Sequence, residues 1–306
     1  FVMFYVTVLG SGATLPTLKR ATTSVAVQRE GDIFLFDCGE GTQVQWLKAG
    51  LRRGKLRAIC ISHTHGDHVN GLVGFLQTLG LHGRERPLIL VGPPGLKDII
   101  KCAKETVGLR TSYHLEEIES TGGPVIEMGG CTVSCRVLDH HRNPTLGFRV
   151  EEAERPGRFD VEAALGLGVP EGPLFGALQR GERVELPNGT VVVASQVLGL
   201  PRAGSALAYC VDTRPCEGAL KLARRVDLLI FDSTFSEDLS FEANEKGHST
   251  ARQAAQIAVD AGANQLLLIH LSERYGSRKR LRVLLEEASS LFPQVEVAHD
   301  LMEIQV

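Results

Sequence analysis

The sequence predicts an α/β fold whose β-sheets are covered by helices on their outer faces. Three observations favour this class. First, short apolar runs that are typical of strands alternate with helical patterns along most of the chain. Second, this alternation occurs twice, before and after a stretch rich in Gly and Pro. Third, 43% of the residues are hydrophobic and 23% are charged, which is ordinary for a globular protein and excludes a disordered or fibrous chain.

In the first half, each strand-like run is mostly apolar and ends in a polar or Gly-containing loop. Such runs are typical of strands that are buried beneath helices. The predicted strands are Phe4–Leu9, Ser24–Gln28, Ile33–Phe36, Ala58–Ser62, Leu88–Val91, Val125–Glu127, Cys131–Leu138 and Gly147–Glu151. The predicted helices are Thr42–Ala49, Val69–Leu79 and Gly95–Val107.

The pattern breaks at residues 152–184, where Gly and Pro are dense and the apolar positions show no sustained period. Segments of this length without regular elements are uncommon inside compact domains and are usually functional or disordered. Because similar halves flank the segment, we expect one large domain over residues 1–306, with a flexible arm inserted at 152–184.

In the second half, the strand and helix patterns resume. Thr250 and Gln253 have the spacing of a capping box at a helix start, and Gly262 is a plausible stop for the same helix. The predicted strands are Val191–Ala194, Ala206–Cys210, Leu228–Phe231, Gln265–His270 and Val295–Ala298. The predicted helices are Cys216–Ala223, Ser249–Ala261 and Lys279–Leu291.

Charge and cysteine content limit the classes of protein and compartment. Lys and Arg number 33 and Asp and Glu 36, so the net charge of −3 excludes a uniformly basic nucleic-acid coat protein. The seven Cys are odd in number and form no CxxC pair, which suits a reducing compartment. The N-terminal run FVMFYVTVLGSG is typical of a strand, not a signal peptide. Since no apolar run approaches the ~20 residues of a membrane helix, we expect a cytoplasmic protein without membrane contact.

The run ISHTHGDHVNGL at Ile61–Leu72 carries the strongest chemical signal. Directly after an apolar strand it places four metal-competent side chains, too close together to share one helical face. Imidazole and carboxylate groups are ligands for zinc and similar divalent ions. The sequence therefore predicts a metal site at a strand end, formed by His63, His65, Asp67 and His68.

Further candidate ligands follow later in the chain. Asp212 ends the run LAYCVD and His270 ends QLLLIH, so both fit the edge of a sheet. Taken alone, each fits a ligand or a capping residue equally well; beside the first cluster, both are favoured as ligands. The other candidates are His141, after VSCRVLDH, and His248, at a predicted helix start.

The HTHGDH run with later single His, Asp and His residues resembles the metallo-β-lactamase superfamily. Further motifs, in order over nearly the whole chain, resemble the short-form ribonuclease Z family of tRNA 3′-end processing endonucleases. They are LGSGATLPTLKRATTS, LFDCGEGTQ, HGDHVNGL, HHRNPTLGFRVEE, GVPEGPLFGAL, CVDTR, DSTF, GHSTARQAA and IHLSERY. The resemblance implies the metallo-β-lactamase αβ/βα sandwich, with two mixed sheets and helices on the outer faces.

The resemblance also implies a site with two zinc ions. The family places one ligand six residues before the Gly of a G-aromatic-R motif, here Gly147, which selects His141 over His140. The implied ligands are His63, His65 and His141 for one ion, Asp67, His68 and His270 for the other, and Asp212 as a bridge.

The implied reaction is hydrolysis of a precursor-tRNA phosphodiester that removes the 3′ trailer and leaves a 3′-hydroxyl. Asp67 would be the proton acceptor, and His248, supported by Asp232, would serve the leaving oxygen. Asp37 is expected to orient a ligand and not to bind metal. The chain departs from the family at Asp232, where a Glu is common, and at Ala21, where an Asn is common.

For substrate binding, the resemblance implies that the arm grips the tRNA elbow and that the protein is a homodimer. The expected RNA contacts are Lys19, Arg20, Arg155, Arg158, Arg180 and Arg274. Two alternatives stay open: another hydrolase of this fold acting on a small phosphodiester or ester, and a non-catalytic RNA-binding relative. A hydrolase of a small substrate would not need the arm. A non-catalytic relative would have lost some of its metal ligands, whereas all the implied ligands are present in this chain.

Overall fold

A computed structural model describes residues 4–141, 143–154 and 156–306 of the chain. Two compact units divide these residues. The residues up to Glu151, together with Ser205–Val306, form the first unit, which we call the body. Residues Glu152–Gly204 form the second unit, which we call the arm.

Within the described residues, the body is built on two seven-stranded sheets. The first sheet has the order β16-β1-β2-β3-β4-β5-β6, and the second has the order β15-β14-β13-β12-β9-β8-β7. In the first sheet β3, β4, β5 and β6 run parallel, whereas β16, β1, β2 and β3 pair antiparallel. In the second sheet β12 to β15 run parallel and β12 pairs antiparallel with β9. Both sheets are therefore mixed.

The elements of the body have the following bounds. The strands of the first sheet are β1 Tyr5–Gly10, β2 Ser24–Arg29, β3 Asp32–Phe36, β4 Leu56–Cys60, β5 Leu88–Gly92, β6 Leu115–Glu119 and β16 Glu303–Gln305. Those of the second are β7 Gly122–Met128, β8 Cys131–Leu138, β9 Thr145–Glu152, β12 Ala206–Cys210, β13 Leu228–Asp232, β14 Gln265–Ile269 and β15 Val295–Val297. The α-helices are α1 Thr42–Lys48, α2 Gly66–Val69, α3 Leu72–Leu81, α4 Leu96–Thr106, α7 Glu217–Ala223, α8 Ser240–Glu245, α9 Ala251–Ala261 and α10 Arg278–Ser289. Three 3-10 helices are η1 Arg53–Lys55, η3 Glu237–Leu239 and η4 Glu273–Tyr275.

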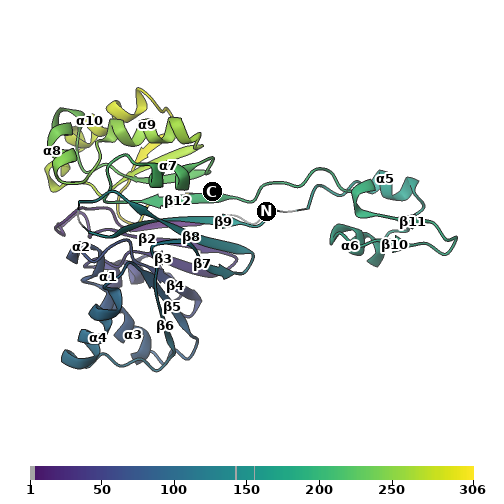
Figure 1. Cartoon of the computed structure of the whole chain (residues 1–306), viewed down its shortest axis with the longest axis horizontal. Coiled ribbons are helices and arrows are strands. Elements are labelled where there is room, and N and C mark those ends of the chain that lie inside the picture. Colours follow the sequence, from purple (N-terminus) through teal and green to yellow (C-terminus); the bar gives the residue numbers. More distant parts are fainter. Residues whose placement is uncertain (1–3, 142, 155) are drawn as a thin grey trace. The chain divides into compact units, whose positions relative to one another are not determined.

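Helices cover the outer face of each sheet, as the sequence predicts (Figure 1). Helices α1, α3 and α4 bury Trp46, Phe75 and Ile100 against the first sheet. Helices α7, α9 and α10 pack against the second sheet through an apolar cluster rich in Ala and Leu. Between the sheets, the rings of Phe36 and Phe148 have their centroids 5.7 Å apart. The predicted class, sheets with helices on the outer faces, is thus confirmed.

Helix α9 shows how local sequence sets an element's ends. Thr250 accepts a hydrogen bond from the Gln253 backbone N–H, and the Gln253 side chain accepts one from the Thr250 N–H. Gly262 ends the helix at φ 64°, a conformation that costs glycine little. The capping box and the stop are both where the sequence predicts them. On this helix Ala254, Ala255 and Ala258 are buried, so the helix lies close to the sheet.

Other elements differ from the prediction. The predicted helix Val69–Leu79 is two helices, α2 and α3, because Gly71 packs on the backbone between them. A Cβ added to Gly71 would lie 2.2 Å from the carbonyl oxygen of Gly39. Strand β6 has the sequence LEEIE. Its three glutamates leave no apolar run, so the sequence did not predict this strand. Among the described residues, every helix is too short or too polar to cross a bilayer.

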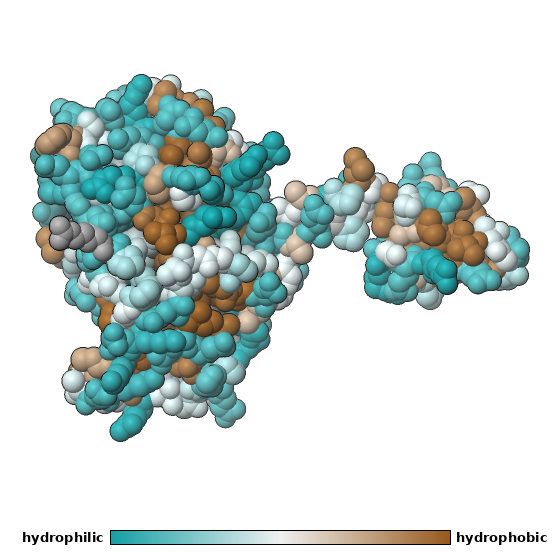
Figure 2. Space-filling view, viewed as in Figure 1, coloured by the Kyte–Doolittle hydropathy of each residue, from teal (hydrophilic) through white to brown (hydrophobic). Residues whose placement is uncertain are grey.

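The arm is a small folded unit, not a loop, and it extends beyond the expected end at residue 184. Its elements are α5 Val161–Gly166, α6 Pro173–Gln179, β10 Val184–Glu185, β11 Val191–Val192 and the 3-10 helix η2 Ala194–Gln196. Each is too short to give a periodic pattern in the sequence. They enclose an apolar core of Ala164, Val169, Leu178, Val184, Leu186, Val192 and Val197. On the face seen in Figure 2, hydrophobic side chains also reach the surface of the arm, which agrees with the exposure of Val161 and Leu165.

Candidate metal centre

Three polar side chains leave the ends of buried strands through left-handed backbone. Asp37 follows β3 at φ 57°, Asp212 follows β12 at φ 49°, and His270 follows β14 at φ 60°. Residues with a Cβ rarely adopt this conformation, which costs about 1–3 kcal/mol each. The surrounding structure must therefore hold all three. Asp212 and His270 thus lie just beyond the ends of strands, close to where the sequence predicts.

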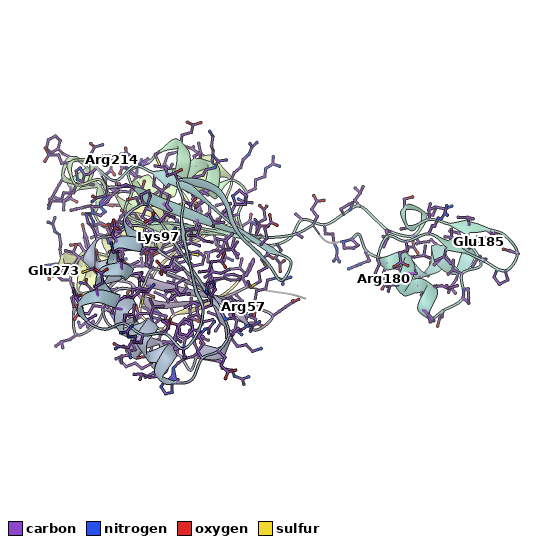
Figure 3. All side chains as sticks on the ribbon, turned by 60° about the horizontal axis from the view of Figure 1, so that its bottom comes forward. Arg57, Lys97, Arg180, Glu185, Arg214 and Glu273 are labelled. Atoms are coloured by element: carbon purple, nitrogen blue, oxygen red, sulfur yellow. The ribbon has the colours of Figure 1, made fainter. Side chains whose placement is uncertain are left out.

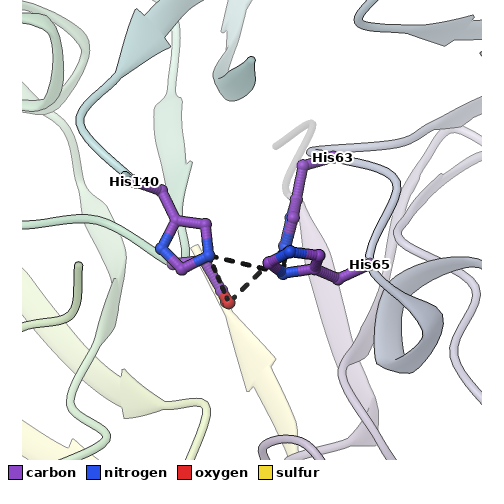
Figure 4. Close-up of side chains that lie close together, drawn as sticks. His63, His65 and His140 are labelled. Carbon is purple, nitrogen blue, oxygen red and sulfur yellow. Dashed lines mark hydrogen bonds and ion pairs between the residues drawn. The ribbon is translucent and has the colours of Figure 1, made fainter. Parts of the chain in front are cut away.

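The HTHGDH run follows β4, as predicted, and brings His63 beside Asp212 and His68 beside Asp37. His63 and His65 lie on the loop before α2, and their Nε2 and Nδ1 atoms are 2.9 Å apart. The Nε2 atom of His140 is 3.4 Å from the same His65 nitrogen. Figure 4 shows the three rings turned toward one point, beside a carboxylate oxygen. Oδ2 of Asp212 is 3.6 Å from His63 Nε2 and 3.8 Å from His140 Nε2.

A second group of donors lies beside the first. Oδ2 of Asp67 is 3.4 Å from Nε2 of His68 and 3.4 Å from Nε2 of His270. Oδ1 of Asp212 is 3.3 Å from His68 Nε2 and 3.0 Å from His270 Nε2. The Asp212 carboxylate therefore presents one oxygen to each group.

Outer hydrogen bonds fix which ring nitrogen of each histidine faces the centre. Asp37, which is fully buried, accepts a hydrogen bond from His68 Nδ1 at 2.8 Å. The carbonyl of Gly247 accepts one from His140 Nδ1 at 2.9 Å. Thr234 donates its hydroxyl hydrogen to Asp232 at 2.7 Å, so it accepts from His270 Nδ1 at 2.8 Å. In the neutral ring, each Nε2 atom therefore carries no hydrogen and has a free lone pair. Neutral imidazole is the form that binds metal.

The residues fit divalent metal ions. Within the described residues, His68 Nε2 and Asp212 Oδ1 are buried and make no hydrogen bond. Nitrogen lone pairs and carboxylate oxygens that face one another in a buried site repel unless a cation or a proton lies between them. Two groups of mixed imidazole and carboxylate donors match the preference of zinc and similar ions. One group is His63, His65, His140 and Asp212, and the other is Asp67, His68 and His270, with Asp212 in reach of both.

The prediction of His141 as a ligand is wrong, because the structure places His140 in the cluster instead. His141 has φ 48° and is exposed, with Nδ1 3.5 Å from Nη2 of Arg214. Neighbouring residues do face opposite ways, as expected. The left-handed turn at His141 decides which of the two faces inward, and motif spacing does not reveal that turn.

His248 and Asp232 form a pair beside the metal-binding groups. Nδ1 of His248 donates to Oδ2 of Asp232 at 2.8 Å, although this carboxylate is one methylene shorter than the common Glu. The His248 ring stacks on His270 with centroids 5.2 Å apart and an interplanar angle of 21°. Burial opposes protonation of His248, but the Asp232 carboxylate outweighs it and raises its pKa to about 9. The ring is therefore suited to hold a proton near neutral pH.

The electrostatics of the cluster follow from burial and mutual contact. Burial lowers the pKa of His63 well below its usual value and also lowers the pKa of His140. Burial opposes ionisation of Asp67, yet the neighbouring His270 and His68 rings hold its pKa below the usual range. Burial likewise opposes charge on Asp212, and the neighbouring histidines lower its pKa.

Three of the residues expected to contact RNA lie in the body. Lys19 donates to the carbonyl of Gly276 at 3.3 Å. Arg274 pairs with Glu242 through two hydrogen bonds of 2.9 and 3.1 Å. The guanidinium of Arg20, which was expected to contact RNA, turns inward and donates to Ser11 Oγ and to the carbonyl of Ala298.

On the arm, Arg158 and Arg180 are exposed, and Figure 3 shows that Arg180 and Glu185 both belong to this unit. Arg155 lies outside the described residues.

Sequence reasoning missed several residues that support the site. Thr234 fixes the His270 ring, and the hydroxyl of Tyr209 donates to Asp37 at 2.7 Å. Asn143 contacts the outer nitrogen of His65. The backbone N–H of Thr14 donates to Asp67 Oδ2 at 2.8 Å. Thr234, Asn143 and Thr14 lie in the quoted motifs and could have been considered, whereas Tyr209 has no local signal.

The chain is similar to proteins of known family. Residues 177–271 match a family model described as a beta-lactamase superfamily domain, and residues 4–143 match one described as anti-Pycsar protein Apyc1. The ribonuclease Z of Salinibacter ruber is 46% identical over 302 residues, covering 97% of this chain and 93% of that protein. The ribonuclease Z of Methanosarcina acetivorans is 41% identical over 305 residues, covering 99% and 98%. The crystal structure of human tRNase Z, short form, matches with TM-score 0.67 at 28% identity, covering 98% of both chains. These matches confirm the metallo-β-lactamase fold.

Proposed function

Because the chain belongs to the ribonuclease Z family, we propose that it is a metal-dependent endoribonuclease that removes the 3′ trailer from precursor tRNA. One observation carries the proposal: two groups of metal-binding donors share Asp212 beside the paired His248 and Asp232. In this arrangement Asp67 can accept the proton of the attacking water, and His248 can donate a proton to the leaving oxygen of the phosphodiester. The absence of eroded ligands speaks against a non-catalytic RNA-binding relative.

We propose two zinc ions as the cofactor. His63, His65 and His140 would hold one ion, Asp67, His68 and His270 the other, and Asp212 would bridge them. When bound, a pair of such ions supplies Lewis-acid activation of the phosphodiester and of the attacking water. The imidazole-rich donor set favours zinc over magnesium or calcium, which prefer oxygen ligands.

The chain's own residues then move the protons. Asp67 accepts the proton of the attacking water, and the Thr14 N–H keeps one of its oxygens in place. His248 donates a proton to the leaving 3′ oxygen of the tRNA. Asp232 holds the opposite nitrogen of that ring and favours its charged form. The product is a tRNA with a free 3′-hydroxyl.

Substrate recognition is assigned to the arm. Exposed guanidinium groups bind phosphates and position RNA without reading its sequence, and Arg158 and Arg180 are such groups. We further propose a homodimer, on the resemblance to the family, in which the arm of one chain serves the other. Seven free cysteines suit a reducing compartment, and we place the protein in the cytoplasm.

The proposal is tested by comparing a 3′-extended precursor tRNA with a small phosphodiester at a fixed zinc concentration. We expect specific cleavage of the precursor tRNA and much weaker turnover of the small ester. Turnover of the small phosphodiester by a zinc-loaded protein that leaves the RNA intact would favour another hydrolase of the same fold.

A further inference from the structure

Asp67 is held from outside its own helix. The Thr14 N–H donates to Asp67 Oδ2 at 2.8 Å, although the two residues are 53 positions apart in the sequence. Thr14 itself has φ 59°, a left-handed conformation that is unusual for a residue with a Cβ. The loop that carries Thr14 runs from Ser11 to Thr22, between β1 and β2, and we call it the clamp loop. Some other contact must hold this loop in so unusual a conformation.

Both ends of the clamp loop are bound by one carboxylate, that of Asp300. Oδ1 of Asp300 accepts from the backbone N–H of Ser11 at 3.1 Å and from its hydroxyl at 2.7 Å. Oδ2 accepts from the backbone N–H of Ala21 at 2.7 Å and from Gln45 Nε2 at 2.7 Å. Asp300 therefore joins the two ends of the loop at its base through hydrogen bonds to Ser11 and Ala21.

Arg20 completes the base. Its Nη1 donates to Ser11 Oγ at 2.5 Å and to the carbonyl of Ala298 at 2.7 Å. Burial lowers the pKa of Arg20, an effect that the nearby Asp300 opposes. The guanidinium thus joins the clamp loop to the same C-terminal segment that carries Asp300.

The clamp loop also meets the second metal-binding group from the other side. Ala13 N–H donates to the carbonyl of Leu271 at 3.0 Å, and Leu271 N–H donates to the carbonyl of Ser11 at 3.0 Å. Leu271 directly follows His270. One loop therefore contacts Asp67 through Thr14 and the backbone next to His270 through Ala13.

We propose that Asp300 is a positioning residue for Asp67, acting through the clamp loop and the Thr14 N–H. The proposal rests on the function given above, in which Asp67 is both a metal ligand and the proton acceptor. It assigns a catalytic consequence to Asp300, which belongs to neither of the metal-binding groups described above. It also gives Arg20 a positioning role in place of the RNA contact expected from the sequence.

The test uses the variants Asp300→Ala and Asp300→Asn in the zinc-loaded full chain. The matched control is Asp98→Ala, which removes an exposed carboxylate on α4. Two readouts are needed: kcat and KM on precursor tRNA and on a small phosphodiester, and the rate at which bound zinc is lost to a chelator. The second readout does not depend on activity.

For Asp300→Ala we expect kcat to fall about 10-fold on both substrates, with KM within twofold, because a misplaced catalytic group slows chemistry and not binding. Zinc loss should be about 10-fold faster, as expected when a contact that orients a ligand is removed. Asp300→Asn, which keeps one acceptor oxygen, should lie between Asp300→Ala and the unmodified chain. Asp98→Ala should match the unmodified chain in every readout.

Three outcomes would overturn the proposal. The first is an Asp300→Ala protein with unchanged kcat and unchanged zinc loss. The second is a rise of KM on precursor tRNA alone, which would make the clamp loop an RNA contact. If Asp300→Ala does not fold, Arg20→Ala, which removes the other side chain that holds the base of the clamp loop, must show losses of the same kind; unchanged values there are the third. If the unmodified chain leaves precursor tRNA intact while Asp300→Ala still speeds zinc loss, the proposed function fails and the positioning role stands.

Discussion

Charged side chains are buried in the metal centre of the body, whereas they are exposed on the arm. In the body, Asp37 is fully buried and accepts hydrogen bonds from Ser62, His68 and Tyr209. In the arm, the ion pair of Arg180 with Glu182 is exposed, with side-chain exposures of 65% and 54%. Exposed pairs contribute about 0–1 kcal/mol, so a phosphate can replace Glu182 at little cost. The body is organised for chemistry in advance, whereas the arm keeps its cations available for a ligand.

The largest effect should come from the body. Asp67→Ala removes a proton acceptor and a metal ligand together, so we expect kcat on precursor tRNA to fall by about 10³-fold or more. Single-turnover cleavage at saturating enzyme would measure it. Removal of zinc with a chelator should abolish cleavage as completely, and added zinc should restore it. Activity that survives full removal of metal would refute the role of the metal centre.

The next test separates two neighbouring histidines. His140→Ala should lower kcat/KM by at least about 100-fold, because loss of a ligand costs at least as much as loss of its supporting contacts. His141→Ala should stay within about threefold, since its ring lies outside the metal-binding groups. Zinc content per chain, measured beside the kinetics, should fall only in His140→Ala. The reverse pattern would restore the assignment made from motif spacing.

Removal of the arm should lower activity on precursor tRNA much more than activity on a small phosphodiester. With residues 156–202 replaced by a short Gly-Ser linker, we expect kcat/KM on precursor tRNA to fall about 30-fold, equivalent to ~2 kcal/mol of lost binding. Turnover of a small phosphodiester should stay within about twofold, because the metal-binding residues all lie in the body. Equal losses on both substrates would show that the arm supports the body's fold and not RNA binding.

The smallest effect should come from a single charge on the arm. Arg180→Ala should raise KM for precursor tRNA about threefold and reduce its salt dependence by about one ion. Glu182→Gln, which removes the competing carboxylate next to Arg180, should leave KM equal or lower. A rise of KM in Glu182→Gln would mean that the ion pair itself, and not the free cation, contributes to binding.

The same contrast between body and arm explains what the sequence could predict. Strand β8 lies where it was expected, at Cys131–Leu138, since its apolar run is long and has clear ends. The arm's helices, such as Val161–Gly166, are too short for periodicity to reveal. In the site, the clustering of the HTHGDH side chains could be predicted because four potential metal donors lie within six residues. The choice of His140 over His141 could not, because it depends on one backbone angle. Asp300 was missed because it acts through hydrogen bonds to residues 279 and 289 positions away.

The central claim is tested most directly by mapping the ends of the RNA that the purified, zinc-loaded chain produces from a 3′-extended precursor tRNA. We predict one cut immediately 3′ of the discriminator base, giving a tRNA with a 3′-hydroxyl, and no such product from the Asp67→Ala protein. An intact precursor in the presence of folded protein that holds its full zinc content would contradict the account.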